Sequence, residues 1–466
     1  MYVFTMPRER WDEKNPNKQA IRTLIAKHQA RVPELKKLMR YYEGEHDILR
    51  DSGRKNKLVC NHAKDISDTA TAYFIGNPVS YKSKEDIAVL TSALDTAGAD
   101  ETDGDNGLDL SIYGRSYEYV YPKEGETDLA IKNLSPENTF MVYDDTIEQN
   151  ELFAVYYYVR KDDTDQTQIT YIATILTKHY KWVLNIEDIE GTQALIESPT
   201  EHFFDEIPVI EYLNNKLAIG DFELQIPLID AYNALMSDRI TDKEQFIDSI
   251  LAIYGALLGD PDATDENGDT SKDRLKKDKL LELPKDAKAE YLTRTFDENG
   301  VEVLKKAIEQ DIHKFSHIPC MTDESFGGNV SGVAMEFKLL GMENITKIKT
   351  RYYKKGLRKR LRLFASWLSR SKAITVNIAD INMTMTRALP KNLLEISQMV
   401  SNLWGKVSKK TLLAQVPFVE DVDEELKAVE KEAKEAAEQQ MAVFGLGSNT
   451  LPDEENSGNK TGDVDE

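Results

Sequence analysis

Two long amphipathic segments on either side of a polar insert constrain this chain more than any other feature. From Pro227 to Tyr254, apolar residues recur at helical spacing, and proline suits the first turn of a helix. About 28 helical residues would extend roughly 42 Å. A second amphipathic helix is predicted from Val301 and stops before Pro319. Because the stretch 260–279 between them is polar and loop-like, the pattern predicts a two-helix stalk that carries a small module.

The N-terminal half is predicted to be a mixed α+β domain. Helices are expected over 17–44 and over 54–79, the second ending at the stop signal Gly76-Asn77-Pro78. The acidic, glycine-containing stretch 100–107 is expected to be a loop. Alternating or continuous β-branched and aromatic residues predict five strands, at 116–121, 139–144, 152–159, 169–176 and 180–186.

The C-terminal half is predicted to be mostly helical. A short hairpin of 280–284 with 289–294 is expected before the second stalk helix, and a glycine-containing loop, 321–332, after it. A long helix follows, with Gly341 and Gly356 as points where it could bend. Residues 374–386 are typical of a strand, and 392–442 of helices. The low-complexity tail from Gly447 is predicted to be disordered.

Charge is unevenly distributed along the 466 residues, whose formal net charge is −22. The stretch from Glu420 to the C-terminus has fifteen acidic and four basic residues, whereas 346–372 has eleven basic residues and no acidic one. Tight binding of duplex DNA relies on neutralised phosphates, so an acidic chain is a poor candidate for it, and a surface that DNA passes without sticking stays compatible with this charge. Lys354, Arg358 and Arg362 share one helix face. This basic helix is interpreted either as a solvated face or a charge-compensated subunit contact, or as a phosphate-facing surface. The acidic C-terminal helix, in the same or a neighbouring subunit, is one electrostatic counterpart.

Composition excludes several classes of protein. No apolar run approaches the length of a membrane span, and the charged N-terminal residues do not resemble a signal peptide. Cys60 and Cys320 are the only cysteines, which excludes a disulfide framework and agrees with a reducing cytoplasm.

No motif identifies a catalytic, metal or cofactor site. Gly327 and Gly332 have the spacing of a phosphate-binding loop, but Val333 stands where that loop needs lysine. The Asp-rich stretches do not fit the calcium-loop formula. His313 and His317 lie four residues apart, but no glutamate follows His313 as in zinc proteases, so a structural pair is favoured. The serine nucleophile motif GxSxG is absent from the sequence.

Five blocks of sequence resemble the siphophage-type portal proteins of tailed bacteriophages, best known from Bacillus phages. They are YYEGEHDI (41–48), NHAKDISDTATAYFIGNPVSY (61–81), SIYGRSYEYVYP (111–122), IPVIEYLNN (207–215) and ESFGGNVSGVAMEFKLLGMENITKIKTRYYKKGL (324–357). The blocks occur in the family's order and cover most of residues 30–370. The last block is the most specific.

The resemblance implies an α+β portal-type subunit with a mixed α/β wing, a two-helix stem, a small α/β clip, a long kinked helix and a helical crown. The wing corresponds to 1–225 and, for the long helix and a strand, to 333–390. The remaining divisions are stem helix 1 (226–254), clip (255–300), stem helix 2 (301–319), tunnel loop (320–332), helical crown (391–445) and a disordered acidic tail (446–466).

The resemblance also implies residues that meet DNA. Candidates for the channel-facing tunnel loop are Asp323, Glu324, Asn329 and Ser331, and Gly327, Gly328 and Gly332 would give this loop its backbone freedom. Weak phosphate contacts are expected from Lys276, Lys277 and Lys279 in the clip and from Lys305 and Lys306 on the second stem helix. A plain surface or inter-subunit role remains open for each of these residues.

A portal subunit assembles with itself into a ring, usually a dodecamer, at one vertex of the capsid. The implied partners are double-stranded DNA, the terminase large subunit, head completion or adaptor proteins, and the major capsid and scaffolding proteins, with no membrane. The implied location is the virion, after assembly in the host cytoplasm, and no cofactor or enzymatic activity is expected. An enzyme acting on nucleic acid or protein would instead show divalent-metal-dependent turnover, and an adaptor without a channel would form no closed rings.

Overall fold

The computed structural model describes most of the chain, and every structural statement below concerns the described residues. They are 3–123, 125–161, 169–186, 194–196, 199–247, 250–254, 264, 288–292, 298–321, 332–387, 393–416, 419 and 422–443. The chain divides into two compact units, Met1–Ala388 and Leu389–Glu466.

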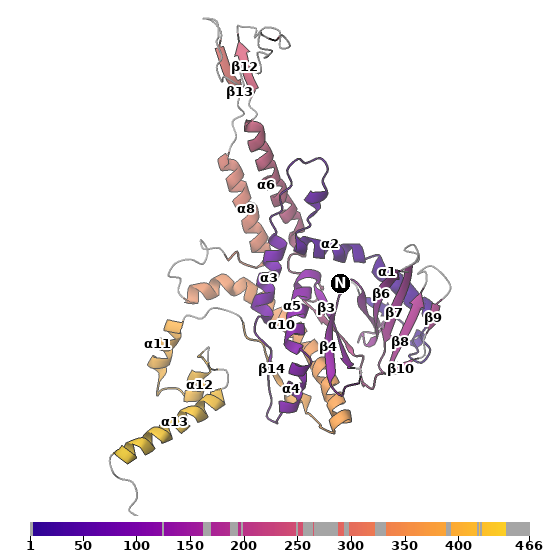
Figure 1. The fold of residues 1–466 in the computed structure, drawn as a ribbon, viewed down its shortest axis with the longest axis vertical. Helices are drawn as coiled ribbons and strands as arrows, with labels where there is room; N and C mark the ends of the chain where they lie inside the picture. The colour runs from indigo at the N-terminus through magenta and orange to yellow at the C-terminus, as the bar shows by residue number, and fades with distance from the viewer. Residues whose placement is uncertain are drawn as a thin grey trace, which may run out of the picture. The chain divides into compact units, whose positions relative to one another are not determined.

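The described elements mix helix and sheet, which agrees with the predicted α+β class (Figure 1). The helices are α1 (Lys18–Gln29), α2 (Val32–Glu43), α3 (His62–Ile75), α4 (Ala88–Thr96), α5 (Ala99–Tyr113), α6 (Ile226–Ile247), α8 (Glu298–Ser316), α10 (Gly332–Lys372), α11 (Leu393–Leu403), α12 (Lys409–Leu413) and α13 (Val422–Val443). Single 3-10 turns are η1 (Arg8–Arg10), η2 (Asp47–Arg50), η3 (Glu223–Gln225) and η4 (Ile378–Asp380). The strands are β1 (Phe4–Met6), β2 (Ser80–Lys82), β3 (Arg115–Pro122), β4 (Leu129–Leu134), β5 (Thr139–Asp144), β6 (Glu151–Lys161), β7 (Ile169–Leu176), β8 (Tyr180–Ile186), β9 (Ala194–Ile196), β10 (Thr200–Glu201), β11 (Val209–Leu213), β12 (Ile250–Tyr254), β13 (Lys288–Leu292) and β14 (Asn382–Thr384).

The first unit is built in layers around two sheets. The larger sheet has the order β1-β5-β6-β7-β8-β10, with β9 on β8, and the smaller has the order β11-β3-β4. Apolar residues of α1 cover one face of the larger sheet, and the other face packs on the smaller sheet. The far side of the smaller sheet meets α3, α4, α5 and α10 in the largest buried cluster. The two sheets therefore lie between an outer helix and an inner group of helices.

Several predictions from the sequence are confirmed at the level of single elements. The expected strands at 139–144 and 169–176 coincide with β5 and β7, and those at 116–121, 152–159 and 180–186 lie within β3, β6 and β8. The helix before Gly76 also ends where predicted. The amphipathic helix expected from Val301 is α8, which begins three residues earlier.

Other predictions about element boundaries were wrong. The first stalk helix ends at Ile247, and the β-branched residues 250–254 pair as β12 with β13 instead of continuing the helix. Of the expected hairpin, 280–284 lies outside the described residues, and β13 takes β12 as its partner. Residues 17–44 form two helices, α1 and α2, and the helix expected from residue 54 begins at His62, where Asn61 caps it. In 374–386, 382–384 alone is a strand, which pairs with β2.

The predicted loop at 100–107 is instead part of helix α5. Gly98 and Gly114, both with positive φ, bound this helix, and Gly107 lies inside it. A Cβ atom on Gly107 would come within 2.6 Å of Cγ2 of Ile75, so this glycine permits α3 and α5 to approach closely. Packing, not a turn, explains the glycine.

Helix α10 runs unbroken through both of its glycines, so neither marks a break in the helix. A Cβ atom on Gly356 would lie 2.3 Å from Cε1 of Tyr212, a fully buried ring that stacks on Tyr353. At Gly341, by contrast, the nearest atom to an added Cβ would be 3.6 Å away, in His317. Gly356 is needed for the close contact between α10 and β11, whereas a methyl group at Gly341 would make ordinary van der Waals contacts with His317.

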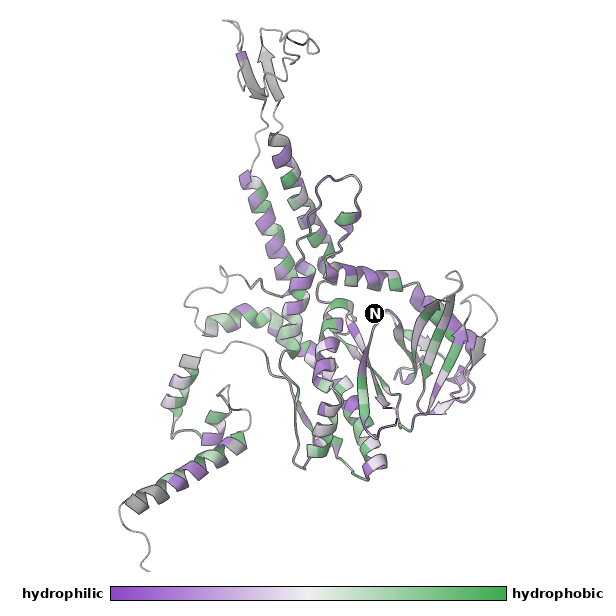
Figure 2. Ribbon diagram, in the orientation of Figure 1, coloured by the Kyte–Doolittle hydropathy of each residue, from purple (hydrophilic) through white to green (hydrophobic). Residues whose placement is uncertain are grey.

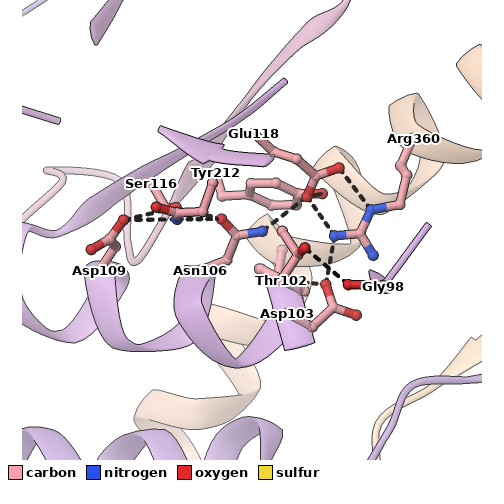
Figure 3. A network of polar contacts seen from close by, with 11 residues as sticks. Gly98, Thr102, Asp103, Asn106, Asp109, Ser116, Glu118, Tyr212 and Arg360 are labelled. Atoms are coloured by element: carbon pink, nitrogen blue, oxygen red, sulfur yellow. Dashed lines mark hydrogen bonds and ion pairs between the residues drawn. The ribbon is translucent and has the colours of Figure 1, made fainter. Parts of the chain in front are cut away.

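A buried polar network fixes α10 against α5 and β3 (Figure 3). Arg360 has no exposed surface; its Nε donates to Glu118 Oε1 (2.8 Å) and its Nη2 donates to Asp103 Oδ1 (2.6 Å). The hydroxyl of Tyr212 donates to Glu118 (3.0 Å). Burial alone would lower the pKa of Arg360, but the carboxylates of Asp103 and Glu118 raise it well above its usual range.

The same network continues to Asp109 at the other end of α5. Asn106 donates to Glu118 (2.9 Å) and accepts from the hydroxyl of Ser116 (2.6 Å). Asn133 donates both to Asn106 (3.0 Å) and to Asp109 (2.9 Å). No cation pairs with Asp109 in the described part of the chain, and burial raises the pKa of its carboxyl to about 7.

We expect the two glycines of α10 to respond in opposite ways to alanine. Gly356→Ala should destabilise the fold by about 1–3 kcal/mol, because the new methyl group overpacks Tyr212. Gly341→Ala, the matched control, should be neutral or stabilising by up to about 1 kcal/mol, because alanine favours helix. Thermal and urea unfolding of both variants measures this, and equal responses would contradict the packing role of Gly356.

Asp109 should make stability depend on pH near neutrality. Its pKa in the folded chain is raised above the unfolded value, so its contribution is fully present at low pH and is lost as pH rises through about 7. Asp109→Asn should therefore increase the free energy of unfolding at pH 8.5, by on the order of a few kcal/mol, and raise the melting temperature there. It should change both little at pH 4 or below, where the unfolded carboxyl also holds its proton. The exposed Asp145→Asn serves as control, and a pH-independent effect of Asp109→Asn would refute the assignment.

Candidate functional site

Helices α6 and α8 pack side by side and form the stalk predicted from the sequence, and the β12–β13 hairpin lies beyond their far end (Figure 1). Two ion pairs join the helices: Arg239 with Glu302 and Lys243 with Glu298, each at 2.9 Å. The side chain of Glu302 also lies 3.5 Å from Lys305. Exposed pairs contribute little stability, so these contacts chiefly fix the register of the two helices.

The base of α6 is held by the segment between α2 and α3. Asn233 accepts from the backbone N–H of Cys60 (2.8 Å), and Ser237 accepts from that of Leu58 (2.9 Å). Tyr41 donates to Asp230 (2.7 Å), and Asn56 donates to Glu244 (2.8 Å). These contacts run over four turns of α6 and anchor the stalk to the first unit. Nothing in the sequence of residues 46–61 indicated this role.

One face of α8 carries apolar side chains that the chain leaves uncovered. Val303 is 69% exposed and Leu304 is 50% exposed, and Ala307 and Phe315 are also exposed. Helical spacing places the four side chains on one side of α8, with Val303 and Ala307 opposite the buried Ile312 and with Leu304 and Phe315 on the flank nearer to it. Figure 2 shows such apolar residues interleaved with polar ones along both stalk helices. We call Val303, Leu304, Ala307 and Phe315 the outer stalk face.

Most bases of α10 have acidic partners in the first unit. Lys349 lies 2.7 Å from Asp221, Arg362 makes a two-point contact with Glu206 (2.5 and 2.8 Å), and Lys359 pairs with Glu151. Lys347, Arg370 and Lys372 pair with Glu343, Asp205 and Asp128. The charges of these bases are therefore compensated within the chain. Their acidic partners lie in the first unit, not in the C-terminal helix.

Four bases of the same helix are different. Arg351, Lys354, Lys355 and Arg358 have no acidic partner among the described residues. Three of them are exposed and Lys354 is half-buried. At spacings of three, four and seven residues, all four lie on one face of α10. We call these four residues the basic face.

Most of the residues that the resemblance assigned to DNA lie outside the described part of the chain. These are Asp323, Glu324, Gly327, Gly328, Asn329 and Ser331 of the tunnel loop and Lys276, Lys277 and Lys279 of the clip. Gly332 is the first residue of α10. On α8, Lys305 is half-buried beside Glu302, whereas Lys306 is exposed. Their roles stay predictions.

The histidines near the end of α8 differ in their surroundings. His313 is buried and its Nδ1 donates to the carbonyl oxygen of Ile318 (3.0 Å), and its ring lies 5.6 Å from that of His62. His317 has a positive φ of 60° just after the end of α8. No group of three or more His, Cys, Asp or Glu suited to a metal ion occurs among the residues described.

None of the described helices has both the length and the apolar composition needed to cross a membrane.

Sequence comparison identifies related proteins. The family model "Phage portal protein, SPP1 Gp6-like" matches residues 21–439. The portal protein of Bacillus phage SPP1 is 27% identical over 472 aligned residues, covering 91% of this chain and 88% of that protein. The portal protein of Clostridium phage phiCD119 is 22% identical, covering 89% of this chain and 96% of that protein. With an α+β body, a two-helix stalk and a family match over most of its length, the chain belongs to the SPP1 Gp6-like family of phage portal proteins.

Proposed function

We propose that this chain assembles into a closed ring at one vertex of a phage capsid and forms the channel for double-stranded DNA. DNA would pass inward during packaging and outward during ejection. In this proposal α6 and α8 are the stem, the β12–β13 hairpin belongs to the clip, and the layered body is the wing. The second unit corresponds to the crown and tail, and the proposed subunit number is twelve.

The outer stalk face is the observation that carries the proposal. A stalk helix with Val303, Leu304 and Phe315 exposed to water is unfavourable for a lone soluble chain, because each such side chain gains about 1.5–3 kcal/mol on full burial. The chain has no described element over this face. Equivalent stalks of neighbouring copies, arranged around an axis, would cover it.

The charge of the chain agrees with a channel that does not hold DNA tightly. A formal net charge of −22 opposes the accumulation of phosphate contacts, so duplex DNA would meet a low barrier to sliding. We propose that 320–332 forms the loop nearest to DNA and that Lys306, which is exposed, makes a weak phosphate contact. Lys305, beside Glu302, is less available for such a contact.

The stem tip is proposed as the docking site for partners. The terminase large subunit would bind there during packaging and supply ATP hydrolysis, and head completion or adaptor proteins would bind there afterwards. The major capsid and scaffolding proteins would contact the body of the ring. No catalytic step is assigned to this chain.

Ring assembly should depend on the outer stalk face. Negative-stain microscopy and mass photometry of the purified chain should detect closed rings with a central hole. Val303→Asp combined with Leu304→Asp should shift the population to monomers and leave the melting temperature of the monomer within a few degrees, because both residues are exposed. Leu217→Asp, an equally exposed apolar position, is the control. A wild-type chain that stays monomeric under all conditions would refute the ring.

The proposed tunnel loop should be separable from assembly. Deletion of Ser325–Val330 should leave rings intact and impair DNA packaging or retention, because in the sequence this segment follows α8 and contains none of the residues of the outer stalk face. Ring yield and packaged DNA, measured side by side, test this. Loss of rings would show that the segment is required for assembly and would contradict its placement at the channel.

A further inference from the structure

We propose that the basic face of α10 docks into an acidic hollow between α4 and α5 of the adjacent copy. This inference rests on the ring of the proposed function and assigns it a specific electrostatic contact between subunits. It concerns surfaces of the first unit alone.

The basic face carries positive charge without acidic partners, on a helix whose other bases mostly form ion pairs. Lys347, Lys349, Lys359, Arg360 and Arg362 each have an acidic partner within the chain. Arg351, Lys354, Lys355 and Arg358 have none among the described residues, although they lie between these paired bases. Four like charges within about two turns repel one another, so an acidic partner would be favourable.

The acidic hollow has a volume of about 200 Å³ and lies between α4, α5 and the segment that leads into β2. Asp95, Asp100 and Asp103 line it, together with Thr91, Leu94 and Tyr81. The hydroxyl of Tyr81 is buried close to Arg360. A hollow lined by carboxylates suits the end of a lysine or arginine side chain, which offers several donors.

Within the chain, one of these carboxylates is neutralised and two are not. Asp103 contacts Arg360 at 2.6 Å. Asp95 and Asp100 are exposed and have no ion pair in the described part of the chain, and the same is true of Glu101 and Asp105 on α5. Partial loss of hydration, and then the nearby carboxylate of Glu101, raise the pKa of Asp105. The surface around the hollow therefore has excess negative charge that a second copy could neutralise.

The two surfaces cannot meet within one chain. Leu90 and Leu94 of α4 are in the same buried cluster as Tyr353, Leu357 and Leu361 of α10. These α10 residues occupy the face turned toward α4 and α5, and the helical spacing turns Arg351 and Arg358 away from it. A surface and its complement on different sides of one subunit give a head-to-tail contact, which is the kind that closes a ring.

A protein partner explains this side of α10 better than nucleic acid. On the same side, toward the N-terminus of α10, Phe337 is 72% exposed, and Leu340 and Ile348 are also exposed. The continuous surface is thus apolar at one end and basic at the other. Phosphates would use the bases and leave the apolar end in water, whereas a neighbouring subunit would bury both.

Charge reversal on each surface, and the mixture of the two variants, tests the contact. The first variant carries Arg351→Glu and Arg358→Glu, and the second carries Asp95→Lys and Asp100→Lys. Each alone should raise the concentration for half-assembly at least about tenfold, because like charges would face each other. An equimolar mixture should restore rings of alternating variants, and a chain with all four substitutions should assemble alone. Lys18→Glu with Lys27→Glu, two exposed bases of α1, is the matched control.

The outcomes separate this inference from the proposed function. If wild-type protein forms no rings, the proposed function itself fails. If wild-type protein and both variants assemble as the control does, this contact alone is refuted. Variants that fail to assemble and are not rescued by mixing would show that the two surfaces have other partners. A first variant that assembles normally but no longer binds a DNA duplex would assign the basic face to nucleic acid. Melting temperatures of each variant verify that it is folded.

Discussion

The burial of Arg360 is the interaction on which the arrangement of the body depends. A guanidinium with no exposed surface loses its hydration, which costs several kcal/mol, and this cost is offset when carboxylates and further hydrogen bonds surround it. Asp103 from α5 and Glu118 from β3 both contact Arg360. Because these three residues come from three elements far apart in the sequence, the network specifies one position of α10 on the smaller sheet. The apolar packing of Tyr353, Leu357 and Leu361 around this network adds to the stability of the fold, but it is less directional than the hydrogen bonds and ion pairs.

Once α10 is fixed in this way, its charges acquire defined roles. Most of its bases pair with acids of the same chain, and each pair adds to the attachment of the helix. The basic face has no such partner among the described residues, and further along the same side of the helix apolar side chains are exposed. A helix that served the stability of one chain alone would not need the basic face. The bases of α10 that have partners in the chain thus hold the helix in place, and those without partners are available for contact with another molecule.

The sequence predicted elements well where local pattern decides them and poorly where tertiary contacts do. Strands such as 139–144 and 169–176 followed from β-branched and aromatic residues, and the stalk from amphipathic spacing. Helix α5 was missed because Gly104, Gly107 and its acids are typical of a loop. The close contact with Ile75 explains why a glycine occurs at position 107 of a helix, and it is a tertiary contact that no local pattern indicates. The partners of Arg360 were also out of reach, since no local pattern relates residue 360 to residues 103 and 118. One signal was available: eleven bases without an acid on a partly apolar helix require acids from elsewhere.

The two uncovered surfaces of the chain would have complementary effects in a ring. The outer stalk face is apolar, and apolar burial is favourable but not directional, so by itself it would permit several registers between neighbouring stalks. The basic face and the acidic hollow carry opposite charges on different sides of the subunit, and attraction between charges depends strongly on distance. Such a pair favours head-to-tail contact and disfavours contact between identical faces. The apolar area on the stalk would then supply most of the affinity between subunits, and the charges on the body would set their orientation. This is a physical reason for one subunit to need both surfaces.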